Sequence, residues 1–450
     1  MDEIELAKDA DSRAYNYLEK TEDRRVFPAA SDIQALDGFI EPISQKGRPA
    51  KETLALMDEL GSPATVASNG PNYFGFVIGA TLPVSAAAER LALAWDQCAL
   101  SFDSGPSAAV LEQQAAEWVL EILDLPRHSA VGFGTSATAC GLACLSAARS
   151  SLLASLGWDF ENDGLIGAPE IRVVIPDTAH ITIKKALRIL GFGLNRIVYA
   201  PTDEFGRIDP AQLPAIDERT ILCLQAGEVN TGEFDPFDEI IPLAKNAGAW
   251  VHVDGAFGLW ARASKNSKCL ASGIEGADSW TTDGHKWLNT PYDSAIAICR
   301  DKGALARAMN SDAAYSTASA TAQKNLTLEF SRRARGIPIW AALRTLGKDG
   351  VADMVDQHIR QAKYVASELQ DIGYDVLNRV VLNQVLVRAD TDETTQSIIE
   401  AAQKTGRVWF GATVWQNRPA FRISVSSYRT KDVHIKQLVK VLADLYHQQT

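Results

Sequence analysis

The chain has 450 residues and a formal net charge of −12 at pH 7, with 46% hydrophobic and 22% charged residues. This length exceeds what one small core needs, so we expect two or three lobes, one of them large. The acidic balance argues against a nucleic-acid partner, which would require a basic face. No segment has the roughly 20 unbroken apolar residues of a membrane span.

The N-terminal residues and the cysteines are typical of a cytoplasmic protein. MDEIELAKDADSRAYNYLEK is acidic and lacks the basic start and apolar segment of a secretory signal. The six cysteines lie in apolar contexts and form no C-x-x-C pair, so we expect reduced thiols in the core. The seven histidines show no H-E-x-x-H or comparable spacing, so we expect no metal site.

The first part of the chain, residues 1–95, is expected to be a helical segment. Pro28, Pro42 and Pro49 divide its opening residues into short helices, and VSAAAERLALAWDQ has a strongly helical pattern. The next helical pattern, AAVLEQQAAEWVLEILDL, ends before Pro126 because proline cannot continue a helix.

From about residue 130, short apolar runs alternate with helical patterns. Helical patterns such as ITIKKALRILG and FDEIIPLAKNAG lie between several of these runs. The runs predicted to be buried strands are IRVVIP (171–176), RIVYA (196–200), TILCLQ (220–225), AWVHVD (249–254) and SAIAICR (294–300). This alternation predicts an α/β domain over residues 96–345, with a mainly parallel sheet covered on both faces.

A smaller α+β domain is expected over residues 346–450. A long helix, VADMVDQHIRQAKYVASELQDIG, precedes the strand pattern NQVLVRA, and the strand pattern FRISVSS precedes a closing helix, DVHIKQLVKVLADLYHQ. The expected fold class is therefore α/β, with a helical N-terminal segment and a small C-terminal α+β domain.

Polar residues follow several predicted strands, where open α/β sheets bind ligands. GFGTSATACGLACLSAARSSLLASLG begins as a loop and becomes a helix, with Ser136, Ala137 and Thr138 at its start. Free N–H groups there would favour an anion such as phosphate; a capped helix without a ligand is the alternative. The chain has neither a P-loop nor a G-x-G-x-x-G motif, so a nucleotide is not the favoured phosphate carrier.

Three further residues follow the predicted strands. His180 comes after IRVVIP and is either a structural residue or an imidazole stacked on a flat ring. Asp254 closes AWVHVD, and a carboxylate at the end of an apolar strand is costly unless a cationic group meets it. Lys286 lies in DSWTTDGHKWLNTPYDS, about thirty residues later; taken alone, a lysine in a loop is a solvated surface charge.

Pyridoxal phosphate explains all four features together. Its phosphate would dock at the helix start, Lys286 would form a Schiff base with it, and Asp254 would keep its pyridine nitrogen protonated. A protonated ring nitrogen makes the cofactor an electron sink. Lys286 must lose its proton to act as a nucleophile, and a desolvated site would assist that loss.

From about residue 70 onward, the sequence resembles the group II pyridoxal-phosphate-dependent decarboxylases, such as aromatic amino acid and glutamate decarboxylase. The motifs that carry the resemblance are GPNYFGF, PSAAVLE, HVDGAFG, DGHKWL and LEFSRRARGIPIWAALRTLG. The resemblance implies a homodimer of fold type I pyridoxal-phosphate enzymes that acts on an amino acid. Lys286 would be the Schiff-base lysine, Asp254 would bind the ring nitrogen, and His180 would stack on the ring.

The resemblance also implies contacts around the phosphate. It places Ala137, Thr138 and His285 near that group. His252, two residues before Asp254 on the same predicted strand, is a weaker candidate for a contact with the cofactor.

The sequence departs from the family pattern at three places. Residues 135–141 lack the Glu and the Asn or Thr that are usual in the family's phosphate helix. Glu228 and Val229 stand where the family usually has two threonines. The segment DAAYSTASATAQKNLTLEFSRR looks shorter than the family's mobile loop, whose tyrosine returns a proton after carbon dioxide leaves. Tyr315 is the only tyrosine in this segment. Either Tyr315 or His180 takes the protonating role, or the reaction is not simple decarboxylation.

The expected function is a pyridoxal-phosphate-dependent lyase that decarboxylates an aromatic or apolar L-amino acid. Tyr73 and Phe74 suggest a pocket for the substrate side chain, although adjacent aromatic residues are also common in cores. Arg422 is a candidate fork for the substrate carboxylate or an ordinary surface arginine. The alternatives are a carbon–carbon lyase of the aldolase type, an aminotransferase, or a homologue that binds the cofactor without catalysis.

Overall fold

The computed structural model describes residues 2–310 and 322–449. Contacts divide the chain into two compact units. The larger unit comprises Thr81–Lys363 and Asn378–Gln384, and the smaller unit comprises Met1–Ala80, Tyr364–Leu377 and Val385–Thr450. The sequence indicated three successive segments, whereas contacts group the first 80 residues with the C-terminal part.

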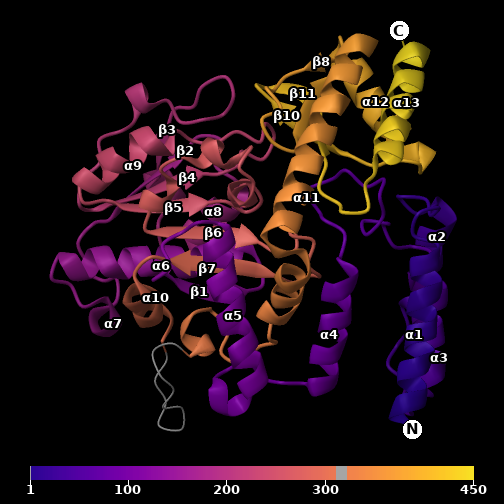
Figure 1. Cartoon of the computed structure of the whole chain (residues 1–450), viewed down its shortest axis with the longest axis horizontal. Helices are drawn as coiled ribbons and strands as arrows, with labels where there is room; N and C mark the ends of the chain where they lie inside the picture. Colours follow the sequence, from indigo (N-terminus) through magenta and orange to yellow (C-terminus); the bar gives the residue numbers. More distant parts are fainter. Residues whose placement is uncertain (1, 311–321, 450) are drawn as a thin grey trace. The chain divides into compact units, whose positions relative to one another are not determined.

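Within the described residues, the larger unit contains a seven-stranded sheet with the order β1-β7-β6-β5-β4-β2-β3. Figure 1 shows these strands following one another from β3 at one edge to β1 at the other. The strands are β1 (Ala130–Gly134), β2 (Arg172–Pro176), β3 (Val198–Ala200), β4 (Thr220–Gln225), β5 (Trp250–Asp254), β6 (Ser279–Asp283) and β7 (Ala295–Cys299). The neighbours from β3 to β6 run parallel. The predicted mainly parallel sheet is confirmed.

Strand β7 runs antiparallel to both of its neighbours, β6 and β1. Only residues 284–294 separate β6 from β7. A parallel return would need a longer crossover connection, usually containing a helix. The short connection therefore sets the direction of β7, and it also carries Lys286.

Helices cover the sheet in the larger unit. Helix α6 packs against α8 and α10, and all three contribute to a core cluster that also contains Trp250 of β5. Val251 and Val253 alternate with Trp250 and are also fully buried, so the opposite face of the strand is covered as well. The helices are α4 (Pro83–Trp95), α5 (Pro106–Ile122), α6 (Ala137–Ser155), α7 (Phe160–Asp163), α8 (Ile181–Ile189), α9 (Phe237–Asn246) and α10 (Lys302–Met309).

Helix α6 is, among the described residues, the one helix long and apolar enough to span a membrane. Of its most apolar stretch, 67% is buried inside the structure. Burial of this kind is typical of a core helix that lies on a sheet.

Strand β1 contains two glycines in a segment that the sequence pattern predicted to be the start of a loop. A Cβ atom at Gly132 would overlap the carbonyl group of Leu326, and one at Gly134 would lie 2.8 Å from Cys140 Sγ. The loop prediction for these residues was wrong, because the glycines allow close packing within the sheet rather than a turn.

All six cysteines are free thiols. Four of them are buried, as expected for core residues, and Cys98 is partly buried. Cys269 is exposed, contrary to the expectation, because it lies in a short surface 3₁₀ helix rather than in the sheet.

The smaller unit is an α+β arrangement. Its described residues contain a four-stranded sheet with the order β10-β11-β9-β8. Its strands are β8 (Asp375–Val376), β9 (Gln384–Arg388), β10 (Gly411–Trp415) and β11 (Arg418–Ser424), so both predicted strand patterns are confirmed. Its helices are α1 (Glu3–Glu19), α2 (Ala30–Ala35), α3 (Ala50–Leu56), α12 (Asp392–Thr405) and α13 (Asp432–Gln449).

The long helix predicted near residue 350 begins earlier than expected. Helix α11 extends over Gly336–Ile372 and is interrupted at Gly347, whose φ of 61° and ψ of −172° are not helical. Glycine adopts this positive φ without the steric cost that a side chain would bring. The predicted segment from residue 351 is therefore the second part of a kinked helix.

Candidate active site

A cavity of about 200 Å³ lies in the larger unit, where several parallel strands end. Gln225, Asp254 and Asp283 are the last residues of β4, β5 and β6, and all three line it. The carboxyl ends of parallel strands meet at one edge of a sheet, where α/β proteins bind ligands. The predicted site residues that line this cavity together are Ser136, Ala137, Thr138, His180, Asp254 and Lys286.

The start of helix α6 forms one wall of the cavity. Ser136 is its N-cap residue, and its hydroxyl oxygen accepts a hydrogen bond from the N–H of Ala139 at 3.2 Å. The N–H of Ala137 donates to Asp283 Oδ1 at 2.7 Å. The helix start that is predicted to bind phosphate therefore faces the cavity, and the Asp283 carboxylate already accepts a hydrogen bond from one of its N–H groups.

Asp283 is a site residue that the sequence pattern did not single out. Its side chain is 3% exposed, and Oδ2 lies 3.5 Å from Lys286 Nζ and 3.7 Å from His285 Nε2. A buried carboxylate is stable where a cation or hydrogen-bond donors meet it, and here the lysine and the Ala137 N–H do so. The available signal was its position at the end of a strand, three residues before the lysine.

His180, Asp254 and Lys286 are each oriented by local contacts. His180 is the N-cap of α8, and its Nδ1 lies 2.7 Å from the Thr182 hydroxyl, which fixes the ring plane. Asp254 is 8% exposed, and its Oδ1 accepts a hydrogen bond from the Ala256 N–H at 3.1 Å. Lys286 Nζ lies 6.0 Å from the centre of the Phe257 ring, which also lines the cavity.

His285 lies behind Lys286 rather than on the cavity wall. Its Nδ1 accepts a hydrogen bond from the Ser294 N–H at 3.1 Å, and its ring stacks on Tyr292 with ring centres 4.3 Å apart. Burial lowers the pKa of His285, so the neutral imidazole is favoured. Its Nε2 faces Asp283, which itself contacts the start of α6.

His252 lies below the cavity on strand β5. It is fully buried, and its Nδ1 lies 2.9 Å from the Ser279 hydroxyl. Among the described residues that line the cavity, His252 is not found. The alternation of side chains along β5 correctly predicts that His252 and Asp254 lie on the same face of the sheet. His252 is two residues farther from the end of the strand, so it lies deeper in the sheet than Asp254.

The burial of His252 is expected to make the free energy of unfolding depend on pH. Burial lowers its pKa from 6.5 to about 4, so the unfolded chain takes up a proton between these values and the folded chain does not. The contribution of His252 to the free energy of unfolding is complete above pH 6.5. It is lost as the pH falls toward 4, and the loss is about 3 kcal/mol. Denaturant unfolding of wild type and His252→Gln from pH 7 to pH 4 measures this difference. The exposed His447→Gln variant should follow wild type, and identical pH slopes for all three proteins would contradict the expectation.

Of the two residues that stand in place of the family's threonines, one reaches the cavity. Val229 lines it. The carboxylate of Glu228 instead accepts hydrogen bonds from the N–H groups of Asn230 and Thr231, both at 2.7 Å. Glu228 therefore closes its own turn, and Val229 presents an apolar surface to the ligand space.

The proposed substrate residues lie in the smaller unit. The ring of Tyr73 stacks on Trp409 with ring centres 4.9 Å apart, and the Phe74 N–H donates to the Trp409 carbonyl at 2.8 Å. Arg422 lies on β11, opposite Gly411. These three described residues are not in the wall of the cavity, so their contacts with substrate remain a prediction. Tyr315 lies outside the described residues.

The residues around the cavity fit pyridoxal phosphate. The start of α6 offers N–H groups for the phosphate, Asp254 offers a carboxylate for the ring nitrogen, and Lys286 offers an amine for the aldehyde carbon. The sheet order and this donor set together define a class of protein, the α/β enzymes that hold pyridoxal phosphate at the carboxyl ends of their strands.

Comparisons with known proteins agree with this class. The pyridoxal-dependent decarboxylase conserved domain matches residues 54–388. The chain is 27% identical over 412 residues to tryptophan decarboxylase 1 from Oryza sativa subsp. japonica, covering 81% of this chain and 78% of that protein. It is 25% identical over 431 residues to the aromatic-L-amino-acid decarboxylase from Bacillus atrophaeus, covering 90% and 88%. The crystal structure of Oryza sativa TDC with PLP and tryptamine superposes with a TM-score of 0.90 at 22% identity, covering 99% and 97%.

The chain belongs to the pyridoxal-dependent decarboxylase family. It is a carboxy-lyase that depends on pyridoxal phosphate, and its fold is that of fold type I decarboxylases. The family resemblance seen in the sequence is confirmed.

The carboxylate of Asp283 is expected to weaken cofactor binding. It lies beside the helix start proposed for the phosphate, where a second negative charge repels a phosphate. Asp283→Asn keeps an acceptor for the Ala137 N–H, removes the charge, and frees Lys286 from its 3.5 Å ion pair. We expect this variant to bind pyridoxal phosphate about tenfold more tightly, a gain of about 1.4 kcal/mol. Equilibrium titration of the cofactor-free protein, followed by absorbance, measures the change.

Two comparisons test that expectation. The exposed Asp349→Asn variant changes the net charge equally and should leave cofactor affinity unchanged. Titration of the cofactor-free proteins with inorganic phosphate measures binding at the phosphate site alone, because inorganic phosphate does not react with Lys286. If Asp283→Asn binds cofactor and phosphate no more tightly than wild type, the carboxylate does not oppose the phosphate.

Proposed function

We propose that this protein removes the carboxylate of an aromatic or apolar L-amino acid as carbon dioxide, with the cofactor attached covalently to Lys286. The observation that carries the proposal is one cavity that gathers Lys286, Asp254 and His180 at the start of α6. The named relatives, a tryptophan decarboxylase and an aromatic-L-amino-acid decarboxylase, support the substrate class. The apolar Val229 and the Phe257 ring in the cavity wall suit an aromatic or apolar ligand.

Each polar residue has a separate task in this proposal. Pyridoxal phosphate supplies, when bound, a sink for the electrons left on the α-carbon. Asp254 would hold a proton on the ring nitrogen, and the N–H groups of α6 would bind the phosphate. Lys286 Nζ would be the nucleophile, and the carboxylate of Asp283 would accept its proton or hold its ammonium form.

The proton that returns to the α-carbon would come from His180 or Tyr315. Nδ1 of His180 is held by Thr182, so a proton would move through Nε2. His180→Asn and Tyr315→Phe separate the two candidates, because the donor's variant loses turnover while both proteins keep bound cofactor.

The substrate test is an incubation of the holoenzyme with single amino acids, β-hydroxy amino acids included, with products identified by mass spectrometry. An amine and carbon dioxide from aromatic or apolar amino acids would support the proposal. Glycine with an aldehyde would indicate an aldolase-type lyase, and a keto acid would indicate an aminotransferase; either result would contradict decarboxylation. Tyr73, Phe74 and Arg422 would then be tested by the specificity of Tyr73→Ala, Phe74→Ala and Arg422→Met.

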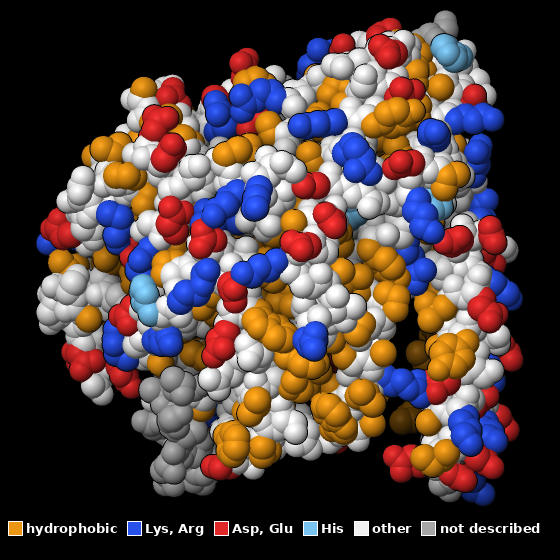
Figure 2. All heavy atoms as spheres, in the orientation of Figure 1, with side chains coloured by type: hydrophobic (Ala, Val, Ile, Leu, Met, Phe, Trp, Pro, Cys, Tyr) orange, Lys and Arg blue, Asp and Glu red, His pale blue; other side chains and the backbone are white. Residues whose placement is uncertain are grey.

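We also propose that the protein is a cytoplasmic homodimer without a nucleic-acid or membrane partner. Figure 2 shows apolar side chains gathered over α4 and α5 of the larger unit. The large apolar residues exposed on these two helices and on the segment between them are Leu91, Leu93, Trp95, Phe102 and Val110. Large contiguous apolar surface is typical of protein interfaces, and a second copy of this chain is the proposed occupant.

A charge within this patch is expected to break the dimer. Leu93 is 72% exposed, and Leu93→Glu would bury a carboxylate in the proposed interface without a partner. Sedimentation velocity should show a dimer for wild type and a monomer for the variant at micromolar concentration. Leu243→Glu, which adds the same charge to an exposed leucine of α9, should remain dimeric. A monomeric wild type, or a dimeric Leu93→Glu, would contradict the proposal.

A further inference from the structure

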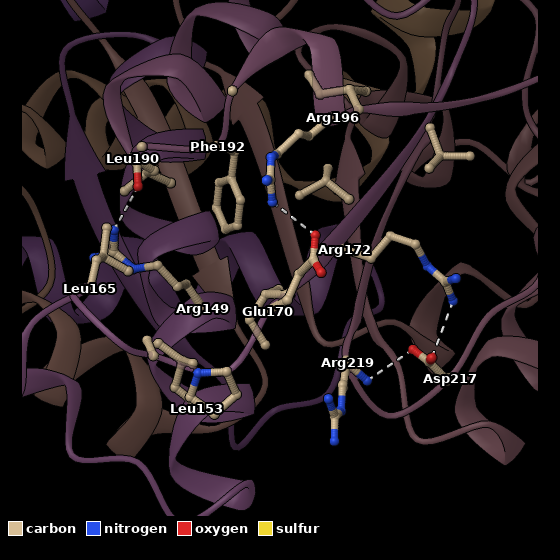
Figure 3. Close-up of a pocket in the computed structure, with 18 residues that line it drawn as sticks. Arg149, Leu153, Leu165, Glu170, Arg172, Leu190, Phe192, Arg196, Asp217 and Arg219 are labelled. Carbon is tan, nitrogen blue, oxygen red and sulfur yellow. Dashed lines mark hydrogen bonds and ion pairs between the residues drawn. The ribbon is translucent and has the colours of Figure 1, made fainter.

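A second and larger cavity, of about 660 Å³, lies at the amino ends of the parallel strands in the larger unit. Arg172 is the first residue of β2, Val198 is the first residue of β3, and Arg219 directly precedes β4. Arg149 and Leu153, from the last part of α6, complete this wall (Figure 3). The decarboxylase residues lie at the opposite ends of these strands, so this cavity is separate from the active site.

The cavity wall carries more positive than negative charge. Four arginines line it, Arg149, Arg172, Arg196 and Arg219, against two carboxylates, Glu170 and Asp217. Figure 3 shows how the carboxylates are paired: Arg196 Nη1 lies 3.0 Å from Glu170 Oε1, and Arg172 Nη2 lies 3.3 Å from Asp217 Oδ2. Among the described residues, no carboxylate forms an ion pair with Arg149, and Asp217 is shared, because it pairs with Arg172 and also accepts a hydrogen bond from the Arg219 N–H at 3.1 Å. Four guanidiniums against two carboxylates leave the wall with two more positive than negative charges.

Arg149 is the most informative of these arginines, because its side chain is buried. The residue is 7% exposed, its Nη1 donates to the Leu190 carbonyl at 2.9 Å, and its guanidinium lies 3.9 Å from the centre of the Phe160 ring. Its Nε meets no acceptor in residues 2–310 and 322–449. Burial lowers the pKa of Arg149, yet a guanidinium stays charged in proteins. A buried charge without a counter-ion is costly, and an anion in the cavity would remove that cost.

A purely structural role explains only part of this arrangement. Leu190 is the C-cap of α8, and an arginine that donates to its carbonyl is a common way to end a helix. That contact uses Nη1 and leaves Nε without an acceptor in the described chain. The Nε of Arg172 is likewise buried without an acceptor among these residues, on the same cavity wall. Both arginines belong to the cavity wall, which therefore holds two guanidiniums whose hydrogen-bonding capacity the described residues do not fill.

The remaining wall is apolar. Leu153, Leu165 and Phe192 line the cavity together with the arginines, as Figure 3 shows. Cavities of roughly 300–1,000 Å³ with apolar walls and a few placed polar groups are typical of small-molecule sites. The wall therefore matches a ligand with one anionic group and one apolar body.

We propose that this cavity binds an amphipathic organic anion, with a carboxylate or phosphate held by the arginines of the wall and an apolar body on Leu153, Leu165 and Phe192. Helix α6 takes part in both sites, because its first residues face the active-site cavity and its last turns carry Arg149 and Leu153. The proposal does not depend on the substrate of the decarboxylase.

The test is calorimetric titration of the holoenzyme, saturated with pyridoxal phosphate so that its phosphate seat is filled. The probes are phenyl phosphate, phenylacetate, inorganic phosphate and the neutral benzyl alcohol. We expect phenyl phosphate or phenylacetate to bind, and inorganic phosphate and benzyl alcohol to bind at least tenfold more weakly. The two aromatic probes distinguish a phosphate ligand from a carboxylate ligand.

Variants then locate the binding. Arg219 is exposed, so Arg219→Glu leaves the core intact, and Arg149→Met removes the buried charge while keeping an unbranched apolar chain. Each is expected to lower the affinity of the bound probe at least tenfold, whereas the exposed Arg407→Glu variant of the smaller unit should match wild type. The proposal is overturned if no aromatic anion binds, if inorganic phosphate binds equally well, or if Arg219→Glu binds the probe as wild type does.

Discussion

Replacing Lys286 by alanine is expected to abolish covalent attachment of pyridoxal phosphate and to lower kcat by on the order of 10⁴-fold or more. The residue supplies the only amine within the described wall of the active-site cavity. After borohydride treatment, peptide mapping of wild type should place the cofactor on the peptide that contains Lys286, and the variant should carry none. The measurement reads attachment directly, independently of any substrate.

A matched variant controls for the loss of a lysine. Lys302, at the start of α10, is exposed, and Lys302→Ala should keep both the attached cofactor and the full activity. Turnover by Lys286→Ala close to the wild-type rate would remove this lysine from the chemistry. Attachment in wild type together with no turnover on any amino acid would instead favour a cofactor-binding homologue without catalysis.

Local sequence patterns were sufficient to predict most of the large sheet. TILCLQ is strand β4 over the same residues, and AWVHVD is β5 without its first residue. These strands are buried on both faces, so their sequences are continuous apolar runs that a turn-forming residue does not interrupt. The same patterns indicated where the strands end, and this is why the sequence alone predicts that Asp254 and Lys286 share one site.

The features that local sequence patterns did not predict depend on contacts between residues far apart in the chain. The glycines of β1 resemble a loop until Leu326 and Cys140 are seen against them. Asp283 sits in the sequence TTDGH, where Asp before Gly is typical of an ordinary turn. Its role follows from the Ala137 N–H, 146 residues earlier in the chain. Nor does any periodicity indicate that the first 80 residues contact the C-terminal part.

The arrangement at the strand ends explains how one fold holds several charges in a small space. Gln225, Asp254 and Asp283 come from neighbouring strands, so each polar side chain stands at the end of a buried strand. Their backbone positions are fixed by the ladder hydrogen bonds rather than by a loop. A site built on rigid elements keeps its geometry without spending binding energy on ordering.

Replacing Asp254 by asparagine is expected to lower kcat by about 10²–10⁴-fold, the range for losing a placed acid–base group, with little change in KM. An amide keeps the size of the side chain and its hydrogen bond from the Ala256 N–H, but it carries no charge to hold a proton on the ring nitrogen. The absorbance of the bound cofactor should shift relative to wild type, because the ring nitrogen loses its proton. Steady-state kinetics and spectra of the purified holoenzymes measure both effects.

Asp254→Glu is the informative companion, since it restores the charge but moves it by one methylene group. It should recover the wild-type spectrum while recovering only part of the rate, because the carboxylate at the end of β5 is buried and has little room to move. A change in stability alone would alter the unfolding midpoint of Asp254→Asn without altering the spectrum. A variant Asp254→Asn with an unchanged spectrum and more than a tenth of the wild-type kcat would show that this carboxylate does not control the ring nitrogen.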